Sequence, residues 1–272
     1  LHVMCHEIWV RADGSGTLKD RLYSRLQRAV HRRCFAAFRS ACVHTHAEPY
    51  RRALKSIGVS ASILPLGSNI HPHDCARREI TNEDAGHISD DSLIFIVFGN
   101  TPPEWDARKV IETLGRACTQ MHKHALVRFI GKGGPTGHEL ERLVCYGAEI
   151  GVRVEHLGFL PAEAALDTMR RADVGLATVP FALWQKSSAV AAMRSCGLPI
   201  CFSRFDGDWP EDWLPRWEDG FFQLQEDAII TAVNRGKGCV IDPWQDAACR
   251  FLAEVNSPFK KSGTPCAVPP SA

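Results

Sequence analysis

The stretch LIFIVFGN, residues 93–100, decides the fold. Six apolar residues follow one another without a polar residue between them, and a glycine and an asparagine end the run. A strand of this composition has both of its faces covered, as central strands of parallel sheets do. The stretch therefore predicts an inner strand of a parallel sheet that carries helices on both faces.

The same rhythm continues after this strand. Apolar runs recur at 126–130, 152–156, 174–177 and 199–202, and segments with helical spacing lie between them at 106–121, 137–150, 161–170 and 188–196. Strands that alternate with helices indicate βαβ units. We therefore predict an α/β fold with a doubly wound, Rossmann-type domain over residues 81–256. Two further helices are expected at 226–233 and 244–255, and the Trp-rich loop at 206–220 is expected to serve packing rather than to cover a cleft.

The residues before this domain predict part of a second Rossmann-like domain, residues 1–80. Short strands are expected at 3–10 and 41–45, a helix at 48–57 and an extended segment at 62–66. The polar stretch 71–91 is the best linker candidate, and residues 257–272 are expected to form a disordered tail. The chain enters strand-like sequence directly at Leu1, which indicates a fragment of a longer protein.

Residues 18–38 have the apolar spacing of an amphipathic helix, with arginines between the apolar positions. The apolar positions are Leu22, Leu26, Val30 and Phe38. The arginines are interpreted as a solvated helix face. Docking of this helix on an anionic membrane surface is the alternative.

Composition narrows the class of protein. The formal net charge is +1, which argues against a nucleic-acid partner, and no apolar run reaches the ~20 residues of a membrane span. The 11 cysteines contain no C-x-x-C pair, so we expect free thiols in a reducing cytosol. Apolar settings are expected for Cys5, Cys145, Cys196 and Cys201. No cysteine spacing typical of zinc is present, and no metal site is predicted.

Glycine-containing loops follow three of the predicted strands, at Gly99, Gly131–Gly134 and Gly158. Ligands of open α/β sheets bind at the carboxyl ends of the strands, and glycine lets a ligand approach the backbone. Plain turn chemistry explains each loop taken alone. Their occurrence on one predicted sheet edge favours a ligand site.

The tripeptide Lys186-Ser187-Ser188 stands at the expected start of a helix on the same edge. Free N–H groups and the positive end of the helix dipole make such a start a site for anions, and the lysine adds a full charge. A diphosphate would fit these groups. The alternative is a serine N-cap beside an exposed lysine, which stabilises a helix by about 1 kcal/mol.

The order of these segments resembles GT-B glycosyltransferases of the family 4 type, also described as glycosyl transferases group 1. The resemblance covers residues 1–202 and lies in order and spacing rather than in one specific motif. It includes His6-Glu7, Val43-His44-Thr45, the Leu64–Asn69 segment and the segments of the predicted donor domain up to Cys196-Gly197-Leu198-Pro199.

This resemblance implies transfer of a sugar from a UDP- or GDP-sugar to a glycan or lipid-linked acceptor, without a metal ion or other cofactor. His6 would face the transferred sugar. The implied donor-binding residues are Gly99, Asn100, Lys132, Gly133, Gly134, Leu157, Gly158, Lys186, Ser187 and Ser188. Members of the family work in the cytoplasm in polysaccharide biosynthesis, often at the inner face of the membrane.

The sequence departs from the family at two carboxylates. The family's Glu-x7-Glu positions fall on Trp184 and Ala192, and its usual Arg and Lys fall on Asn100 and Trp105. A non-catalytic module that binds nucleotide sugars is therefore a second hypothesis. A metallohydrolase built on the His-x-His pairs is a weaker third one, because the pairs at 44/46, 71/73 and 122/124 lie on different predicted elements.

Overall fold

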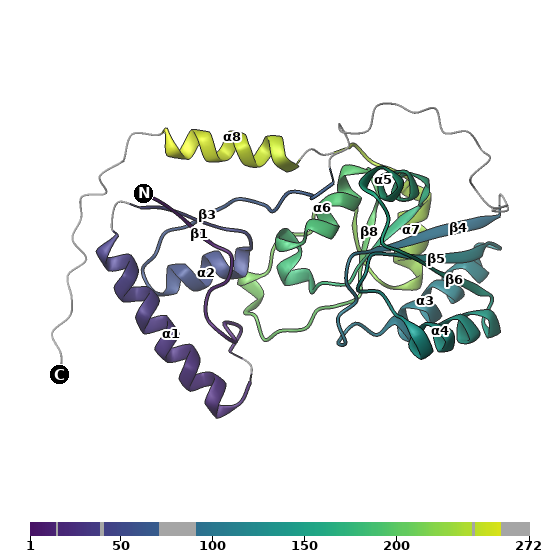
Figure 1. Cartoon of the computed structure of the whole chain (residues 1–272), viewed down its shortest axis with the longest axis horizontal. Helices are drawn as coiled ribbons and strands as arrows, with labels where there is room; N and C mark the ends of the chain where they lie inside the picture. Colours follow the sequence, from purple (N-terminus) through teal and green to yellow (C-terminus); the bar gives the residue numbers. More distant parts are fainter. Residues whose placement is uncertain (15, 39–40, 71–90, 241–242, 257–272) are drawn as a thin grey trace.

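The computed structural model describes residues 1–14, 16–38, 41–70, 91–240 and 243–256 (Figure 1). The predicted linker after residue 70 and the predicted tail lie outside these residues. The first unit contains five elements: β1 (His2–Cys5), α1 (Leu18–Ala37), β2 (Cys42–Thr45), α2 (Glu48–Ser56) and β3 (Ser62–Ile63). Its strands form a parallel sheet in the order β1-β2-β3.

The second unit begins with β4 (Ser92–Phe98), the strand predicted from the opening stretch. The elements after it are α3 (Ala107–Gln120), β5 (His124–Ile130), α4 (Gly137–Glu149), β6 (Val152–Gly158), α5 (Ala162–Arg171), β7 (Val174–Ala177), η2 (Phe181–Lys186), α6 (Ser188–Ser195), β8 (Ile200–Phe202), η3 (Glu211–Trp213), β9 (Phe221–Gln223), α7 (Glu226–Arg235) and α8 (Pro243–Val255). The sheet order is β6-β5-β4-β7-β8-β9, all parallel. This is the 3-2-1-4-5-6 order of the Rossmann fold, so the predicted α/β fold is confirmed.

Both faces of this sheet are covered, which explains the unbroken apolar run of β4. Ile94 and Ile96 pack against α5 and α6, whereas Phe95 and Val97 pack against α3, α4 and α7. Side chains of a strand alternate between its faces, so a strand between two helical layers needs an apolar residue at every position.

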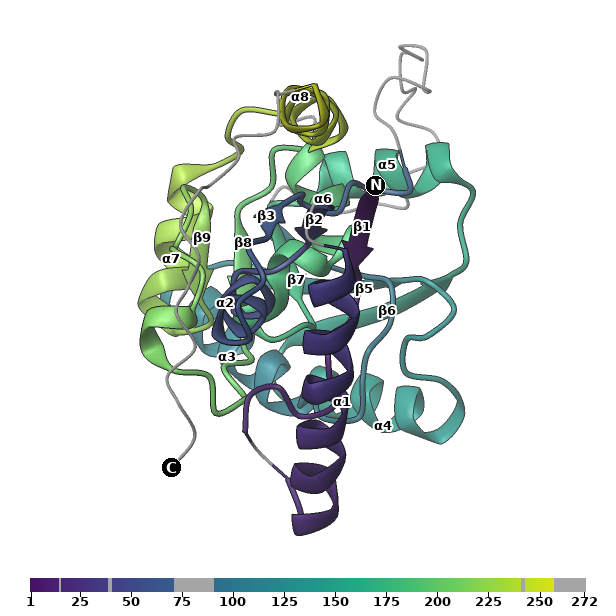
Figure 2. The same ribbon diagram turned by 90° about the vertical axis from the view of Figure 1, so that its left-hand side faces the viewer.

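Helix α1 confirms the predicted helix but not the burial that its apolar spacing implies. It has no buried residue, and Leu22 and Leu26 are 69% and 60% exposed. Its N-terminus carries a capping box, in which Thr17 and Asp20 each satisfy a backbone N–H of the other. Such capping stabilises a helix by about 1 kcal/mol. Helix α1 lies at the left-hand side of the molecule in Figure 1 and in the foreground of Figure 2.

Helix α8 returns from the second unit and lies over the first sheet (Figure 1). The indole Nε1 of Trp244 donates to the carbonyl of Ser68 over 2.6 Å, and the ring of Phe251 packs 4.9 Å from that of His2. The sequence assigns residues 244–255 to the second domain. In space they contact the first unit, because their partners lie in the strands and the exit segment of that unit.

The Trp-rich loop packs on both units. Trp217 stacks on Phe181 with ring centroids 4.0 Å apart, and Trp209 lies 6.2 Å from Tyr50 of α2. The packing interpretation of this loop therefore agrees with the contacts. Strand β9, which follows the loop, has no counterpart among the predicted strands, because three residues are too few for a periodic signal.

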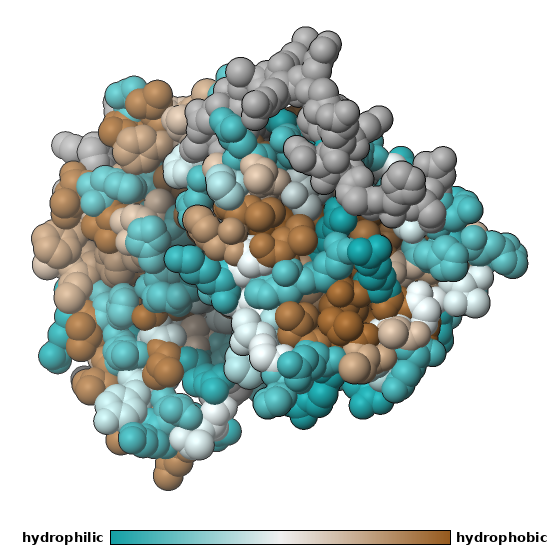
Figure 3. Space-filling view, turned by 45° about the vertical axis from the view of Figure 1, so that its right-hand side comes forward, coloured by the Kyte–Doolittle hydropathy of each residue, from teal (hydrophilic) through white to brown (hydrophobic). Residues whose placement is uncertain are grey.

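The surface carries both apolar and hydrophilic side chains, and the described cysteines form no disulfide bonds. Apolar side chains reach the surface in separate patches with hydrophilic residues between them, on the face shown in Figure 3. None of the nine cysteines in the described ranges forms a disulfide bond. Cys5, Cys196 and Cys201 are buried as expected, but Cys145 is exposed, because it lies on the outer side of α4. Among the described helices, none is both long and apolar enough to span a membrane.

Candidate functional site

The loops after β4, β5 and β6 are joined by backbone hydrogen bonds at the carboxyl edge of the second sheet. Gly99 N–H donates to the carbonyl of Ile130, and Thr101 N–H donates to that of Gly133, each over 2.8 Å. Gly131 N–H donates to the carbonyl of Gly158, also over 2.8 Å. The structure thus brings together seven of the predicted donor-binding residues: Gly99, Asn100, Lys132, Gly133, Gly134, Leu157 and Gly158.

The glycines of the β5 loop are required by contacts between loops. A Cβ on Gly131 would lie 2.7 Å from the carbonyl oxygen of Gly99, and one on Gly133 would overlap Oδ1 of Asn100. A Cβ on Gly134 would lie 2.9 Å from Nε2 of His156. Gly158 differs, because its φ is +65° and a Cβ added there would meet no atom within 4 Å. Close packing therefore accounts for three glycines, and Gly158 faces open space.

The side on which the chain adds strands to the sheet changes between β4 and β7, which are parallel neighbours. The chain builds β5 and β6 on one side of β4 and then crosses to β7 on the other side. The hydroxyl of Thr178, after β7, donates to the carbonyl of Asn100, after β4, over 2.8 Å. Such a topological switch point is where open α/β sheets bind ligands.

Helix α6 begins at this switch point. Ser187 is its N-cap: the buried hydroxyl accepts a hydrogen bond from Val190 N–H over 3.2 Å. The capping interpretation is thus confirmed for Ser187, and Ser188 is the first helical residue. Ala189, in the first turn, has its Cβ 3.5 Å from the position of a Cβ on Gly99. The first turn of α6 therefore lies beside the loop after β4.

Lys186 is held by two residues of the first unit. Its ammonium group pairs with the carboxylate of Glu7, and it lies 3.4 Å from the hydroxyl of Tyr50 and 5.2 Å from the centroid of its ring. Tyr50 also donates to Glu7 over 2.8 Å. Partial burial tends to raise the pKa of Glu7, but the hydrogen bonds from Lys186 and Tyr50 lower it overall. Burial, and then the bond to Glu7, raise the pKa of Tyr50.

His6 follows β1 and is oriented by a buried histidine. Nδ1 of His46 lies 2.8 Å from the carbonyl of Leu64, and a carbonyl can only accept, so Nδ1 of His46 carries hydrogen. Nε2 of His46 then accepts from Nδ1 of His6, over 2.9 Å. In neutral His6 this leaves Nε2 with a free electron pair, on an exposed side chain. The structure therefore fixes the tautomer of the predicted catalytic histidine.

Lys132 reaches the same edge from the loop after β5. Its ammonium group lies 4.9 Å from the centroid of the Phe159 ring, and its side chain is exposed. Among the described residues none forms an ion pair with Lys132, so its exposed ammonium group is available to an anionic ligand of the loops after β5 and β6.

The two departures from the family have a structural reason. Trp184 and Ala192 are 5% and 0% exposed and lie in the core of the second unit. Trp184 packs edge-on against Phe221 with centroids 4.9 Å apart, and its Nε1 has no hydrogen-bond partner among the described residues. A carboxylate at either position would be buried in an apolar environment, at high cost.

Sequence reasoning missed the residues that join the two units. Gln185 accepts a hydrogen bond from Glu48 N–H at its side chain and from Leu66 N–H at its carbonyl, each over 3.0 Å. Glu7 and Tyr50 were also missed as partners of Lys186. The only available signal was the position of Glu7 directly after His6, because nothing local to α2 marks Tyr50.

The His-x-His pairs do not act as chelating pairs. His44 lies beside His2, with ring centroids 4.9 Å apart, whereas His46 lies just past the carboxyl end of β2 and contacts His6. The pair at 122/124 is divided between a turn and the start of β5, and the pair at 71/73 lies outside the described residues. The two histidines of each described His-x-His pair therefore do not share a ligand site.

No family model matches the chain, and no curated protein matches its sequence. The chain is similar to solved glycosyltransferase structures. An O-GlcNAc transferase mutant from Thermobaculum terrenum matches with 17% identity and a TM-score of 0.39, over 64% of this chain and 34% of that one. The lipopolysaccharide outer core galactosyltransferase WaaB matches with 14% identity and a TM-score of 0.39, over 78% of this chain and 62% of that one.

A third match is TarM from S. aureus, solved with fondaparinux, α-GlcNAc-glycerol and UDP. Its identity is 11% and its TM-score 0.48, over 92% of this chain and 47% of TarM. The chain thus spans less than two thirds of the length of each of these three proteins. The fold of the second unit is assigned from its own strand order and not from these matches.

Proposed function

We propose that this chain binds a nucleotide-diphosphate sugar at the carboxyl edge of its second sheet and transfers the sugar to a glycan or lipid-linked acceptor. The observation that carries the proposal is the meeting of two units at the switch point. Lys186 and the start of α6 belong to the second unit, whereas His6 and Glu7 come from the first.

The diphosphate is assigned to Lys186 and the start of α6. The first-turn N–H groups and the helix dipole attract an anion there, and an exposed interaction of this kind contributes about 0.3–1 kcal/mol. A hydrogen bond from a lysine to a phosphate adds about 1.5–3 kcal/mol. These groups stabilise the negative charge of the leaving diphosphate, so the proposed transfer needs no metal ion. The nucleotide lies along the loops of Lys132 and Gly158.

The acceptor is assigned to the side of His6. Its Nε2 has the free electron pair that a general base needs, and His46 holds the ring from the other nitrogen. A base at the boundary of the two units removes a proton from an acceptor hydroxyl while the diphosphate leaves from the opposite unit. His6 is therefore proposed as the catalytic base.

Nucleotide binding tests this proposal directly. UDP or GDP is expected to raise the melting temperature of the full chain, and UMP or GMP to raise it less, because the second phosphate supplies the contact to Lys186. A ligand at 100 times its dissociation constant stabilises a protein by about 2.7 kcal/mol. Differential scanning fluorimetry with the four nucleotides measures this. A folded sample that neither diphosphate stabilises would contradict the donor site.

Binding without transfer is a second candidate, which the burial of Trp184 and Ala192 favours. Neither position can hold the carboxylate that the family of resemblance has there unless the surrounding core residues repack. The two functions are separated by release of nucleotide from UDP- and GDP-sugars in the presence of acceptor extracts. A chain that binds the diphosphate and releases no nucleotide is a binding module.

Peripheral association with anionic membranes is proposed for α1. Its exposed residues Leu18, Leu22, Leu26 and Val30 recur every fourth position and form one apolar stripe, 84%, 69%, 60% and 51% exposed in that order. Six basic residues and one acidic residue share the helix: Lys19, Arg21, Arg25, Arg28, Arg32 and Arg33, with Asp20. An exposed apolar stripe with a basic surround is typical of helices that lie in the interface of an anionic membrane.

Vesicle sedimentation tests this surface. The full chain is expected to bind phosphatidylglycerol vesicles at low salt and not phosphatidylcholine vesicles. The double variant Leu22→Glu, Leu26→Glu is expected to lose at least about 100-fold in affinity, since each leucine contributes at least about 1.5 kcal/mol when buried and each 1.4 kcal/mol is a factor of ten. Val144→Glu, on exposed α4, is the control. Unchanged binding of the double variant, or a dimer that this variant abolishes, would contradict membrane docking.

A further inference from the structure

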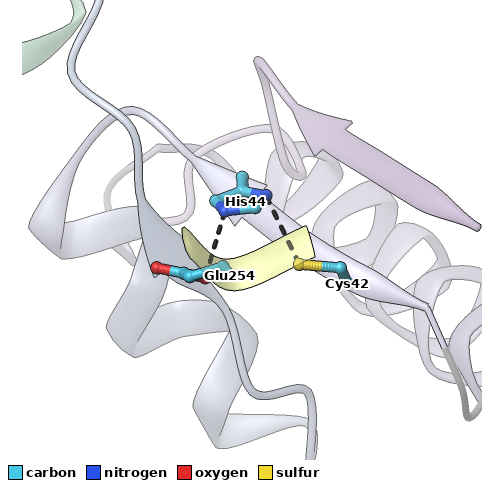
Figure 4. A group of neighbouring side chains, drawn as sticks. All are labelled: Cys42, His44 and Glu254. Carbon is cyan, nitrogen blue, oxygen red and sulfur yellow. Dashed lines mark hydrogen bonds and ion pairs between the residues drawn. The ribbon is translucent and has the colours of Figure 1, made fainter. Parts of the chain in front are cut away.

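Four potential metal ligands meet where α8 crosses the first sheet, away from the proposed donor site. The parallel register pairs His2 with Cys42, and His44 lies two residues further along β2. Side chains two residues apart on a strand share a face, so Cys42 and His44 point to the same side of the sheet. Helix α8 covers this side and brings Glu254 to the imidazole of His44 (Figure 4).

The donor atoms of this cluster converge on His44. Its Nδ1 lies 2.9 Å from Nε2 of His2 and 3.8 Å from Sγ of Cys42. Its Nε2 lies 3.1 Å from Oε2 of Glu254. One ligand atom each from Cys42, His44 and Glu254 lies within 4.8 Å of the other two. Atoms from three other potential ligands thus surround the His44 ring.

Contacts within the protein leave this ring incompletely satisfied. His44 is 0% exposed, and its Nε2 forms no hydrogen bond with a described residue, although Oε2 of Glu254 lies 3.1 Å from it. A buried polar nitrogen without a partner costs about 1–3 kcal/mol. At the same time, a thiol and a second imidazole both face Nδ1, which forms one hydrogen bond. A cation bound to Nδ1 would gather the thiol and the second imidazole around it. It would also fix the hydrogen of the ring on Nε2, on the side of Glu254.

The distances fit a tetrahedral zinc ion. Bonds of about 2.0 Å to nitrogen and about 2.3 Å to sulfur place two nitrogens about 3.3 Å apart, and a nitrogen and a sulfur about 3.6 Å apart. The observed separations from Nδ1 of His44 are 2.9 Å to the nitrogen of His2 and 3.8 Å to the sulfur of Cys42. Each of the two separations differs from its tetrahedral value by a few tenths of an ångström. A thiolate with two imidazoles selects zinc over magnesium or calcium.

We propose that His2, Cys42 and His44 bind a zinc ion, with His44 acting through Nδ1 and Glu254 holding the hydrogen on its Nε2. One ion bonds to one nitrogen of an imidazole, and Nδ1 is the one that faces two other donors. With Nδ1 on the metal, Nε2 carries hydrogen and Glu254 is the acceptor within reach, as carboxylates commonly are behind zinc-bound histidines.

The proposed ion has a structural consequence. It ties β1 to β2 directly and holds α8 on the sheet through Glu254, so it links segments about 40 and about 210 residues apart in the sequence. Binding releases the thiol proton of Cys42 to solvent. The fourth position of the tetrahedron is left to water.

Zinc binding by the full chain, made without a histidine tag and stripped with chelator, tests the proposal. Wild type is expected to take up one zinc ion per chain by atomic emission and to melt at a higher temperature with zinc than without it. Cys42→Ser is expected to lose at least 100-fold in zinc affinity in a chelator competition. Cys34→Ser, which removes an exposed thiol of α1, is expected to bind like wild type.

The variant Glu254→Gln tests whether Glu254 orients His44 or binds the zinc ion itself. A residue behind the ligands typically changes metal affinity by 10- to 100-fold, so this variant is expected to bind zinc more weakly and still reach one ion per chain. Complete loss in this variant would overturn the role given to Glu254. Equal zinc binding by wild type and Cys42→Ser, or none by folded wild type, would overturn the site. Stabilisation by UDP or GDP in the same samples reports separately on the proposed function.

Discussion

Replacing His6 with glutamine is expected to lower the rate of sugar transfer by about 100- to 10,000-fold, the range that loss of a general base produces. The reason is geometric. His46 fixes the tautomer of His6, so Nε2 offers its electron pair on the exposed side of the ring. Glutamine preserves the polarity of the position but its amide cannot accept a proton at neutral pH.

The measurement is release of UDP or GDP from the corresponding sugar nucleotide with acceptor present. His6 does not touch the proposed diphosphate groups, so His6→Gln is expected to retain stabilisation by UDP or GDP. Rate and binding therefore separate in this variant. A rate within a factor of about three of wild type would contradict the role of His6.

The partner of His6 provides a graded control. In His46→Asn the side-chain amide still donates to the carbonyl of Leu64, but the acceptor for Nδ1 of His6 is gone. We expect a smaller loss of rate than in His6→Gln, because the base remains and only its orientation is lost. A larger loss than in His6→Gln would indicate that the substitution damages the fold, which a melting curve would show.

Replacing Lys186 with alanine is expected to weaken UDP or GDP binding by about 10- to 100-fold. A charge-assisted hydrogen bond to a phosphate contributes about 1.5–3 kcal/mol, and each 1.4 kcal/mol is a factor of ten. Isothermal titration calorimetry measures the change. Lys55→Ala, which removes an exposed lysine at the end of α2, is the matched control and is expected to bind like wild type.

Glu7→Gln is expected to act in the opposite direction. The Glu7 carboxylate holds the ammonium group of Lys186, so a diphosphate must compete with it. Exposed ion pairs contribute about 0.2–1 kcal/mol, and their removal should strengthen binding by up to about fivefold. Tyr50 can still donate to the glutamine side chain. Weaker binding in Glu7→Gln would mean that the ion pair belongs to the binding site rather than competing with the ligand.

The strands and helices of the second unit were predictable because each carries a local signal. Strand β7 has the predicted bounds, and α3 lies one residue inside them at each end. The strand order was not in the sequence pattern, although alternation of strands and helices favoured a doubly wound sheet. Short elements were predicted less well. The sequence does not predict β9, which has three residues, and β1 ends at Cys5 rather than at Val10.

In the candidate site, too, the local features were predictable from the sequence and the contacts between distant segments were not. The loops of Gly99, Gly131–Gly134 and Gly158 were found from sequence because each follows an apolar strand. Their glycines were linked to ligand approach, but three of them are explained by contacts between loops. The sequence predicts Lys186 as a contact for a diphosphate, and the structure pairs it with Glu7, 179 residues away in sequence.

By itself the sequence determined the elements of this protein and the edge at which its loops gather. Apolar runs and helical spacing are local properties, and parallel strands place their carboxyl ends on one side. Only the tertiary structure decided which groups meet: Lys186 with Glu7, His6 with His46, and Glu254 with His44. These partners lie on different elements, and their distance in space depends on how whole sheets and helices pack.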